Sequence, residues 1–123
     1  MPLIVIAEDE FLIADVLAMM LEDAGYEVAS APHGAAALSL IKKQRPALII
    51  TDFMMPLMTG LELARAIRAD PELETLPIIL TSGAQGSIGR AEPQMFNVVL
   101  DKPYDERKLL EAVAQLLNGT MSS

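Results

Sequence analysis

The sequence predicts a doubly wound α/β domain, in which helices cover both faces of a parallel five-stranded sheet. Two observations support this fold class. Short runs rich in Val, Ile and Leu recur along the chain, and their nearly continuous apolar character is typical of parallel strands buried on both faces. Segments with helical periodicity separate these runs, and this alternation predicts right-handed crossovers between parallel strands.

Five segments are expected to form the strands. Each is a short apolar run, and the five cover residues 3–6, 26–29, 47–50, 77–80 and 97–100. Four other segments are expected to form regular helices, because apolar residues recur in them at helical spacing. These helices cover residues 11–24, 34–44, 59–69 and 104–117. In the first of them one broad apolar stripe is expected, formed by Leu12, Ile13, Val16, Leu17, Met20 and Leu21. Each of the four helices precedes a helix-stopping signal: Gly25, Pro46, the Asp70-Pro71 pair and the Asn118-Gly119 pair.

Residues 83–93 are poorer helix material. They contain Gly83, Gly86, Gly89 and Pro93, and each interior Gly costs a helix about 1 kcal/mol while Pro costs about 3 kcal/mol. A short, distorted or mobile helix is expected there. Residues 119–123 are expected to be a flexible tail, so the folded domain should span residues 1–118.

The composition fits one domain that is large enough to bury a core without disulfides or metals. The chain has no Cys, which fits a reducing compartment, the cytoplasm by default. The N-terminus lacks the basic lead-in and cleavage site of a signal peptide. No apolar stretch approaches the length of about 18 residues that a membrane span needs. We therefore expect a cytoplasmic protein without membrane insertion.

The formal net charge is -8, with a pI of about 4.5. This is the wrong sign for binding a phosphate backbone, and basic residues cluster only at positions 42–45. Direct binding to nucleic acid is therefore not expected.

Polar residues stand at the ends of four predicted strands: Glu8-Asp9, Asp52, Thr81-Ser82 and Asp101-Lys102. In a doubly wound sheet these ends meet at one edge, where ligands bind. Three neighbouring carboxylates repel one another unless a cation offsets their charge. Because the cluster offers oxygen and no His or Cys, it favours a hard ion, Mg²⁺ before Ca²⁺.

The same edge carries groups suited to phosphoryl transfer. Asp52 is a carboxylate nucleophile, Lys102 is a cation, and Thr81 or Ser82 supplies a hydroxyl. No base for activating water is evident. The site is therefore expected to hold an acyl phosphate more than to hydrolyse it.

Four motifs show that the sequence resembles a response-regulator receiver domain of two-component signalling, over residues 3–117. They are the pair Glu8-Asp9, the segment TDFMMPLMTGLEL around Asp52, the segment PIILTSG, and the segment LDKPYD around Lys102. The resemblance implies a flavodoxin-like (βα)5 fold with strand order 2-1-3-4-5. It also implies a cis bond between Lys102 and Pro103.

The resemblance assigns roles to the strand-end residues. Asp52 would be the phosphoacceptor, and Asp9 and Asp52 would bind Mg²⁺ directly together with the backbone carbonyl of Met54. Glu8 would act through a water molecule.

Lys102 would contact the phosphoryl oxygens, and Ser82 would move toward them. Ser82 is preferred to Thr81 because the hydroxyl of relatives usually lies five residues after the strand-opening proline, here Pro77.

The chain departs from the family pattern at several positions. Val99 stands where relatives often carry an aromatic residue, so an aromatic switch is not expected, and the segment from Ser82 to Lys102 is about two residues shorter than usual. Met54 and Ala84 occupy two positions that commonly tune hydrolysis, and neither can orient water. We therefore predict slow loss of the phosphoryl group.

We interpret the chain as a receiver domain that is either stand-alone or part of a larger protein. The resemblance implies a signalling protein and not an enzyme. It would take a phosphoryl group from a phosphohistidine of a sensor histidine kinase or a phosphotransfer protein, and a downstream protein would read its altered surface. One alternative is a degenerate receiver acting as an interaction module. Another is a small Mg²⁺-dependent phosphohydrolase, which would need a second acid where Met54 stands.

Overall fold

The computed structural model describes residues 1–83 and 86–118 and forms one five-stranded parallel sheet, in the order β2-β1-β3-β4-β5. The strands are β1 (Leu3–Ala7), β2 (Glu27–Ala31), β3 (Leu48–Asp52), β4 (Ile78–Ser82) and β5 (Val98–Asp101). The predicted fold class and strand order are therefore confirmed.

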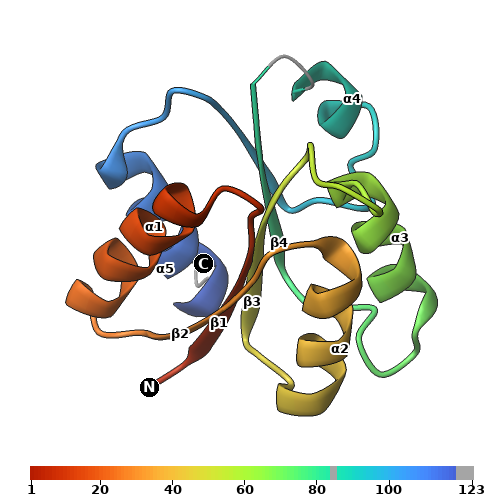
Figure 1. Cartoon of the computed structure of the whole chain (residues 1–123), viewed down its shortest axis with the longest axis horizontal. Helices are drawn as coiled ribbons and strands as arrows, with labels where there is room; N and C mark the ends of the chain where they lie inside the picture. Colours follow the sequence, from red (N-terminus) through yellow and green to blue (C-terminus); the bar gives the residue numbers. More distant parts are fainter. Residues whose placement is uncertain (84–85, 119–123) are drawn as a thin grey trace.

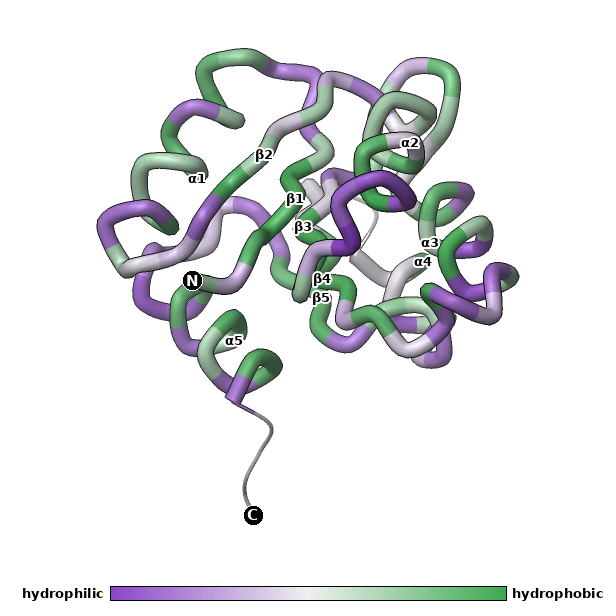
Figure 2. Tube along the Cα trace, turned by 90° about the horizontal axis from the view of Figure 1, so that it is seen from below, coloured by the Kyte–Doolittle hydropathy of each residue, from purple (hydrophilic) through white to green (hydrophobic). Residues whose placement is uncertain are grey.

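Helices cover both faces of the sheet (Figure 1). One face carries α1 (Phe11–Asp23) and α5 (Glu106–Asn118), and the other carries α2 (Gly34–Gln44), α3 (Gly60–Ala69) and the short α4 (Gly86–Arg90). Two apolar clusters fill these layers, with Val5 and Ile49 on the α2–α3 side and Ile4 and Ile50 on the α1–α5 side. Figure 2 shows the hydrophobic strands between the two helical layers. No helix in the described residues is both long and apolar enough to cross a membrane.

Every strand ends one or two residues later than the apolar pattern predicted. The ladder of parallel pairing continues past the last apolar residue, so that Asp52 lies opposite Thr81 and Ser82 lies opposite Asp101. These polar residues are therefore the last residues of rigid strands. The prediction had placed them just beyond the strands.

The helix ends follow local capping contacts. The bounds of α2 are as predicted. Helix α3 begins at Gly60, one residue later than predicted, because Thr59 is its N-cap. Thr59 Oγ1 accepts a hydrogen bond from the Glu62 amide at 3.1 Å, and Glu62 Oε1 accepts one from the Thr59 amide at 2.8 Å. The start of α5 shifts from residue 104 to Glu106, because Asp105 Oδ1 accepts a hydrogen bond from the Lys108 amide at 2.8 Å. Residues 119–123, the predicted tail, lie outside the described residues.

Part of the exposed side of α1 is apolar. Its buried side consists of Ala14, Leu17 and Leu21, while Leu12 and Val16 of the predicted apolar stripe are exposed. Phe11 and Met19 are exposed as well. The predicted stripe was therefore too broad, because a helix on one face of a sheet buries only part of its circumference.

The predicted short helix in residues 83–93 is confirmed as α4, which has five residues. Its close approach to the sheet depends on glycine: a Cβ at Gly89 would lie 2.5 Å from Leu80 Cδ2 and 3.3 Å from Val99 Cγ2. Ala84 and Gln85 lie outside the described residues.

Arg68, near the end of α3, joins two connections on the side of the sheet away from the polar edge. Its guanidinium donates five hydrogen bonds, to the carbonyls of Gln94, Glu74, Leu76 and Met95 and to Asn97 Oδ1. Asn97 Oδ1 also accepts a hydrogen bond from the Ile78 amide at 2.8 Å. One side chain thus holds the segment before β4 against the segment before β5.

Candidate functional site

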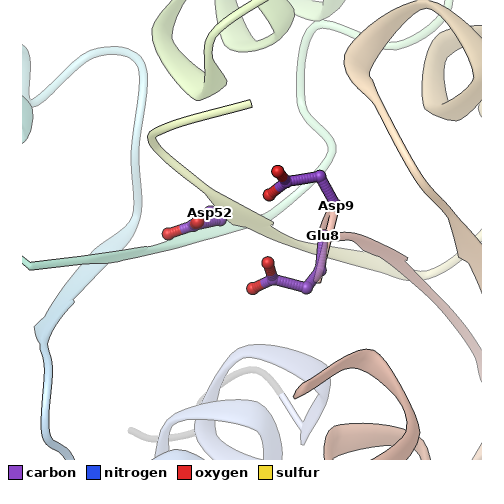
Figure 3. A group of neighbouring side chains, drawn as sticks. All are labelled: Glu8, Asp9 and Asp52. Carbon is purple, nitrogen blue, oxygen red and sulfur yellow. The ribbon is translucent and has the colours of Figure 1, made fainter. Parts of the chain in front are cut away.

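The carboxylates of Glu8, Asp9 and Asp52 meet at the carboxyl edge of the sheet. Glu8 and Asp9 directly follow β1, and Asp52 ends the adjacent strand β3. One oxygen from each lies within 4.8 Å of the others. Figure 3 shows Glu8 and Asp9 extending to opposite sides of the end of β1, with both carboxylates turned to the side where Asp52 lies. Glu8 and Asp52 are buried, whereas Asp9 is exposed.

Lys102 directly follows β5 and reaches this carboxylate group. Its Nζ lies 3.1 Å from Asp52 Oδ1 and 3.8 Å from Glu8 Oε1. The first distance allows a charge-assisted hydrogen bond, whereas the second is too long for one. The Lys102 backbone is also fixed, because its amide donates to the Ser82 carbonyl at 2.7 Å. The bond from Lys102 to Pro103 is cis, as predicted.

Glu8 is incompletely satisfied in the protein alone. Its Oε2 accepts a hydrogen bond from the Glu10 amide at 3.0 Å, but its buried Oε1 has no hydrogen-bond partner in the described residues. Burial raises the pKa of Glu8, and the charge of Asp52 raises it further, although the Glu10 amide and Lys102 act in the opposite direction. Lys102 therefore lies beside two of the three carboxylates, those of Asp52 and Glu8.

These donors fit a hard divalent cation. The cluster offers an oxygen atom from each of three carboxylates, and one of the buried oxygens lacks a hydrogen-bond partner in the described part of the chain. Buried polar atoms without partners are rare, and oxygen is the donor that Mg²⁺ prefers. Glu8, Asp9 and Asp52 could thus hold the predicted ion.

Two hydroxyls end β4 beside the carboxylates. Thr81 and Ser82 are both buried, and Thr81 lies opposite Asp52 in the ladder. Ser82 Oγ has no hydrogen-bond partner in residues 1–83 and 86–118. The choice of Ser82 over Thr81 stays a prediction.

The β3–α3 connection folds back tightly onto β3. The Gly60 amide donates to the Phe53 carbonyl at 2.8 Å, and a Cβ at Gly60 would collide with the Asp52 carbonyl oxygen. This position therefore requires glycine, in agreement with its place in the motif. Met54 lies in the connection with an exposed side chain, and its carbonyl as a metal ligand stays a prediction.

Sequence reasoning missed Tyr104 and the contact made by His33. Burial raises the pKa of Tyr104, and the charges of Glu8 and Asp52 add to this shift, so the phenol lies near the carboxylates. Its position after Lys102-Pro103 was the available signal. His33 caps α2 through Nδ1, which accepts a hydrogen bond from the Ala36 amide at 3.1 Å.

The described residues form a doubly wound α/β domain with three carboxylates and a lysine at the carboxyl edge of its sheet. Residues 4–114 match the response regulator receiver domain. The chain therefore belongs to the response regulator receiver family.

Individual relatives agree with this assignment. An uncharacterized 14.6 kDa protein from Leptolyngbya boryana is 40% identical over 91% of this chain and 87% of its own length. The DNA-binding regulator RpaA of Synechocystis is 32% identical over 98% of this chain. The chain spans only 51% of RpaA, about half of that longer relative.

Solved structures show the same fold. The receiver domain of a signal transduction histidine kinase from Syntrophus aciditrophicus has a TM-score of 0.90 at 30% identity, covering 100% of this chain and 95% of that chain. The receiver domain of a sensor histidine kinase from Pseudomonas aeruginosa has a TM-score of 0.88 at 25% identity, covering 96% and 98%. The latter structure contains a magnesium ion coordinated in its active site cleft.

Proposed function

We propose that residues 1–118 form a single phosphoacceptor receiver domain, which takes a phosphoryl group from a phosphohistidine onto Asp52. The observation that carries this proposal is the 3.1 Å contact between Lys102 Nζ and Asp52 Oδ1, inside a cluster of three carboxylates. An ordinary surface ion pair would not need two further acids beside it. A nucleophile that receives a highly charged group needs both a cation and a metal site nearby.

In the proposed step, a carboxylate oxygen of Asp52 attacks the phosphorus of the phosphohistidine. A P–O bond to Asp52 forms as the P–N bond to the imidazole breaks, and the imidazole nitrogen leaves with the electron pair. Lys102 Nζ already lies beside Asp52, so it can contact the phosphoryl oxygens without a large movement. Ser82 Oγ has no hydrogen-bond partner in residues 1–83 and 86–118, and it can donate a hydrogen bond to the same group.

We propose Mg²⁺ as the resident ion, held by Asp9, Asp52 and the carbonyl of Met54, with Glu8 acting through water. When bound, it would neutralise the charge of the carboxylates and of the incoming phosphoryl group. Two observations support this assignment. Glu8 Oε1 has no hydrogen-bond partner in the described part of the chain, and the relative from Pseudomonas aeruginosa contains a magnesium ion.

The phosphorylated form is expected to persist. Met54 is exposed beside the site and offers no side-chain oxygen or nitrogen to position an attacking water. Ala84, the other position that commonly tunes hydrolysis, lies outside the described residues. Loss of the phosphoryl group within seconds would contradict this proposal.

The physiological donor would be a sensor histidine kinase or a histidine phosphotransfer protein, and a downstream protein would read the phosphorylated surface. In this role the protein is a cytoplasmic signalling component, and its only chemistry is self-phosphorylation and slow self-dephosphorylation. Membership of the receiver family supports these assignments.

Intact-mass measurement after incubation with acetyl phosphate and Mg²⁺ tests the proposal. The wild type should gain one phosphoryl group, Asp52→Asn should gain none, and Asp15→Asn, at an exposed position on α1, should behave as the wild type. Steady release of phosphate without an adduct would favour a phosphohydrolase. No reaction at all would favour a degenerate receiver that serves as an interaction module.

A further inference from the structure

An ion pair ties α4 to the end of β5. Arg90 is the last residue of α4, and Asp101 is the last residue of β5. Arg90 Nη2 lies 2.6 Å from Asp101 Oδ2, and both side chains are about half exposed. The pair lies over Gly86, the first residue of α4, because a Cβ there would collide with Asp101 Oδ1 and lie 2.8 Å from Arg90 Nη1. Both ends of this short helix therefore contact the pair.

Asp101 is linked to the phosphoacceptor pocket by two routes. It directly precedes Lys102, whose Nζ contacts Asp52. It also lies opposite Ser82 in the β4–β5 ladder, and the Lys102 amide donates to the Ser82 carbonyl at 2.7 Å. The two groups proposed to contact the phosphoryl oxygens thus flank Asp101, one along the chain and one across the sheet.

We propose that the Arg90–Asp101 pair is a latch, which holds α4 against β5 in the unphosphorylated protein and opens when Asp52 is phosphorylated. This inference rests on the proposed function. A phosphoryl group on Asp52 would contact Lys102 Nζ, which already lies beside Asp52. It would also draw toward its oxygens the Ser82 hydroxyl, whose Oγ has no hydrogen-bond partner in the described residues. Asp101 lies opposite Ser82 in the β4–β5 ladder, so it would shift together with Ser82 and move away from Arg90.

The construction of β5 suits such a movement. In the described sheet β5 is an edge strand that pairs only with β4, and Val98, Val99 and Leu100 are only partly buried. The strand can therefore shift with less disturbance of the core than β1 or β3 could. Val99 packs beneath Gly89. Because Val99 is aliphatic, position 99 supplies no aromatic side chain, and this corner instead holds the charged pair between α4 and β5.

The strength of the pair also suits a latch. An ion pair between exposed side chains changes an equilibrium by about fivefold at most. A new set of charge-assisted hydrogen bonds to a phosphoryl group can exceed that amount. The pair also lines a cleft of about 560 Å³ that includes Tyr104 and Lys108, so its opening would alter the charge and the shape of that surface.

Hydrogen exchange at the end of α4 tests the latch. The reporters are the amides of Ala91 and Glu92, which donate to the carbonyls of Ser87 at 3.1 Å and Gly89 at 3.0 Å. Exchange is measured before and after treatment with acetyl phosphate and Mg²⁺, and intact mass gives the phosphorylated fraction. In the wild type, phosphorylation should accelerate exchange of both amides.

Two matched pairs of variants separate the latch from other effects. Arg90→Gln removes the pair, whereas Arg90→Lys keeps a cation that can still reach Asp101. Gly86→Ala displaces Asp101 sterically, whereas a Cβ at Gly83 meets no atom within 4 Å and Gly83→Ala is the control. Alanine favours helix over glycine, so helix propensity cannot explain faster exchange in Gly86→Ala.

Without phosphate, Arg90→Gln and Gly86→Ala should exchange up to about fivefold faster than the wild type, while Arg90→Lys and Gly83→Ala match it. Unchanged exchange in a fully phosphorylated wild type, or in unphosphorylated Arg90→Gln, would overturn the latch and leave the proposed function intact. Absence of any adduct on Asp52 would overturn both. Because Arg90 is half exposed, Arg90→Gln keeps the test valid even if Gly86→Ala does not fold.

Discussion

The acidic pocket and the α4–β5 corner share one edge of the sheet but are built differently. The pocket rests on β1 and β3, central strands whose side chains are almost all buried. The corner rests on β5, an edge strand with partly buried side chains, covered by a five-residue helix and an exposed ion pair. The carboxylates are thus held at the ends of buried strands, while the neighbouring surface belongs to the less stable part of the fold, where local movement costs least.

The largest difference is expected in stability. Ile49→Ala in β3 should lower the free energy of unfolding by about 2–5 kcal/mol, because the side chain is fully buried and leaves a cavity. Val98→Ala in β5 should cost only about 1 kcal/mol, since this side chain is partly buried. Urea unfolding of both variants measures the contrast. Equal losses would show that the two regions are equally well packed.

Lys102 sharpens the comparison because it follows the edge strand and yet contacts the rigid pocket. Lys102→Met keeps the length of the side chain but removes the charge beside Asp52. The rate of adduct formation from acetyl phosphate should fall by about 100-fold or more. Lys108→Met, at an exposed position on α5, is the control and should react at the wild-type rate. A similar rate in both variants would remove Lys102 from the mechanism.

Thr59 tests whether the stability of the region around the acidic pocket also depends on a helix cap, because Thr59 is the N-cap of α3, the helix that follows β3. Thr59→Ala removes the side-chain oxygen that accepts from the Glu62 amide, and it should lower the free energy of unfolding by about 1 kcal/mol. Thr59→Ser keeps the hydroxyl and should restore most of that loss. If urea unfolding does not distinguish Ala from Ser, the cap contributes nothing to stability.

The smallest effect is expected at Glu8, where the Glu10 amide and Lys102 already offset part of the cost of burial. Glu8→Gln should raise the thermal midpoint near pH 7 without divalent ions, because burial raises the pKa of Glu8 in the folded protein above its ordinary value of 4.5. The folded wild type therefore binds more protons than the unfolded chain between these two pKa values, and it gains stability as the pH falls through this range.

The advantage of Gln should accordingly disappear below pH 4.5. Glu10→Gln, at an exposed position, is the control and should not show this pH dependence. An advantage for Gln at position 8 that does not depend on pH would contradict the electrostatic explanation.

The sequence predicted the pocket better than the corner, and there is a physical reason. Glu8, Asp9, Asp52 and Lys102 stand at the ends of apolar runs, and parallel strands bring such ends to one edge whatever path the loops take. The contact between Arg90 and Asp101 depends on how the segment after β4 returns to the sheet. The spacing of apolar residues does not predict the path of that segment.

Strand ends were missed for a similar reason. An apolar run marks what is buried, but the ladder of hydrogen bonds continued to Asp52 and Ser82, whose polar side chains carry no hydrophobic signal. The cap formed by His33 and the hydrogen bonds of Arg68 likewise depend on individual side-chain contacts. A periodic pattern of apolar residues does not predict such contacts.

Arg68 has a consequence for engineering of the domain. Because one guanidinium binds carbonyls from both the connection before β4 and the connection before β5, neither connection can change its length without disturbing the other. In a chimaera that takes its α4–β5 corner from another receiver, residues 68–78 and 94–97 should therefore be transplanted together as one module.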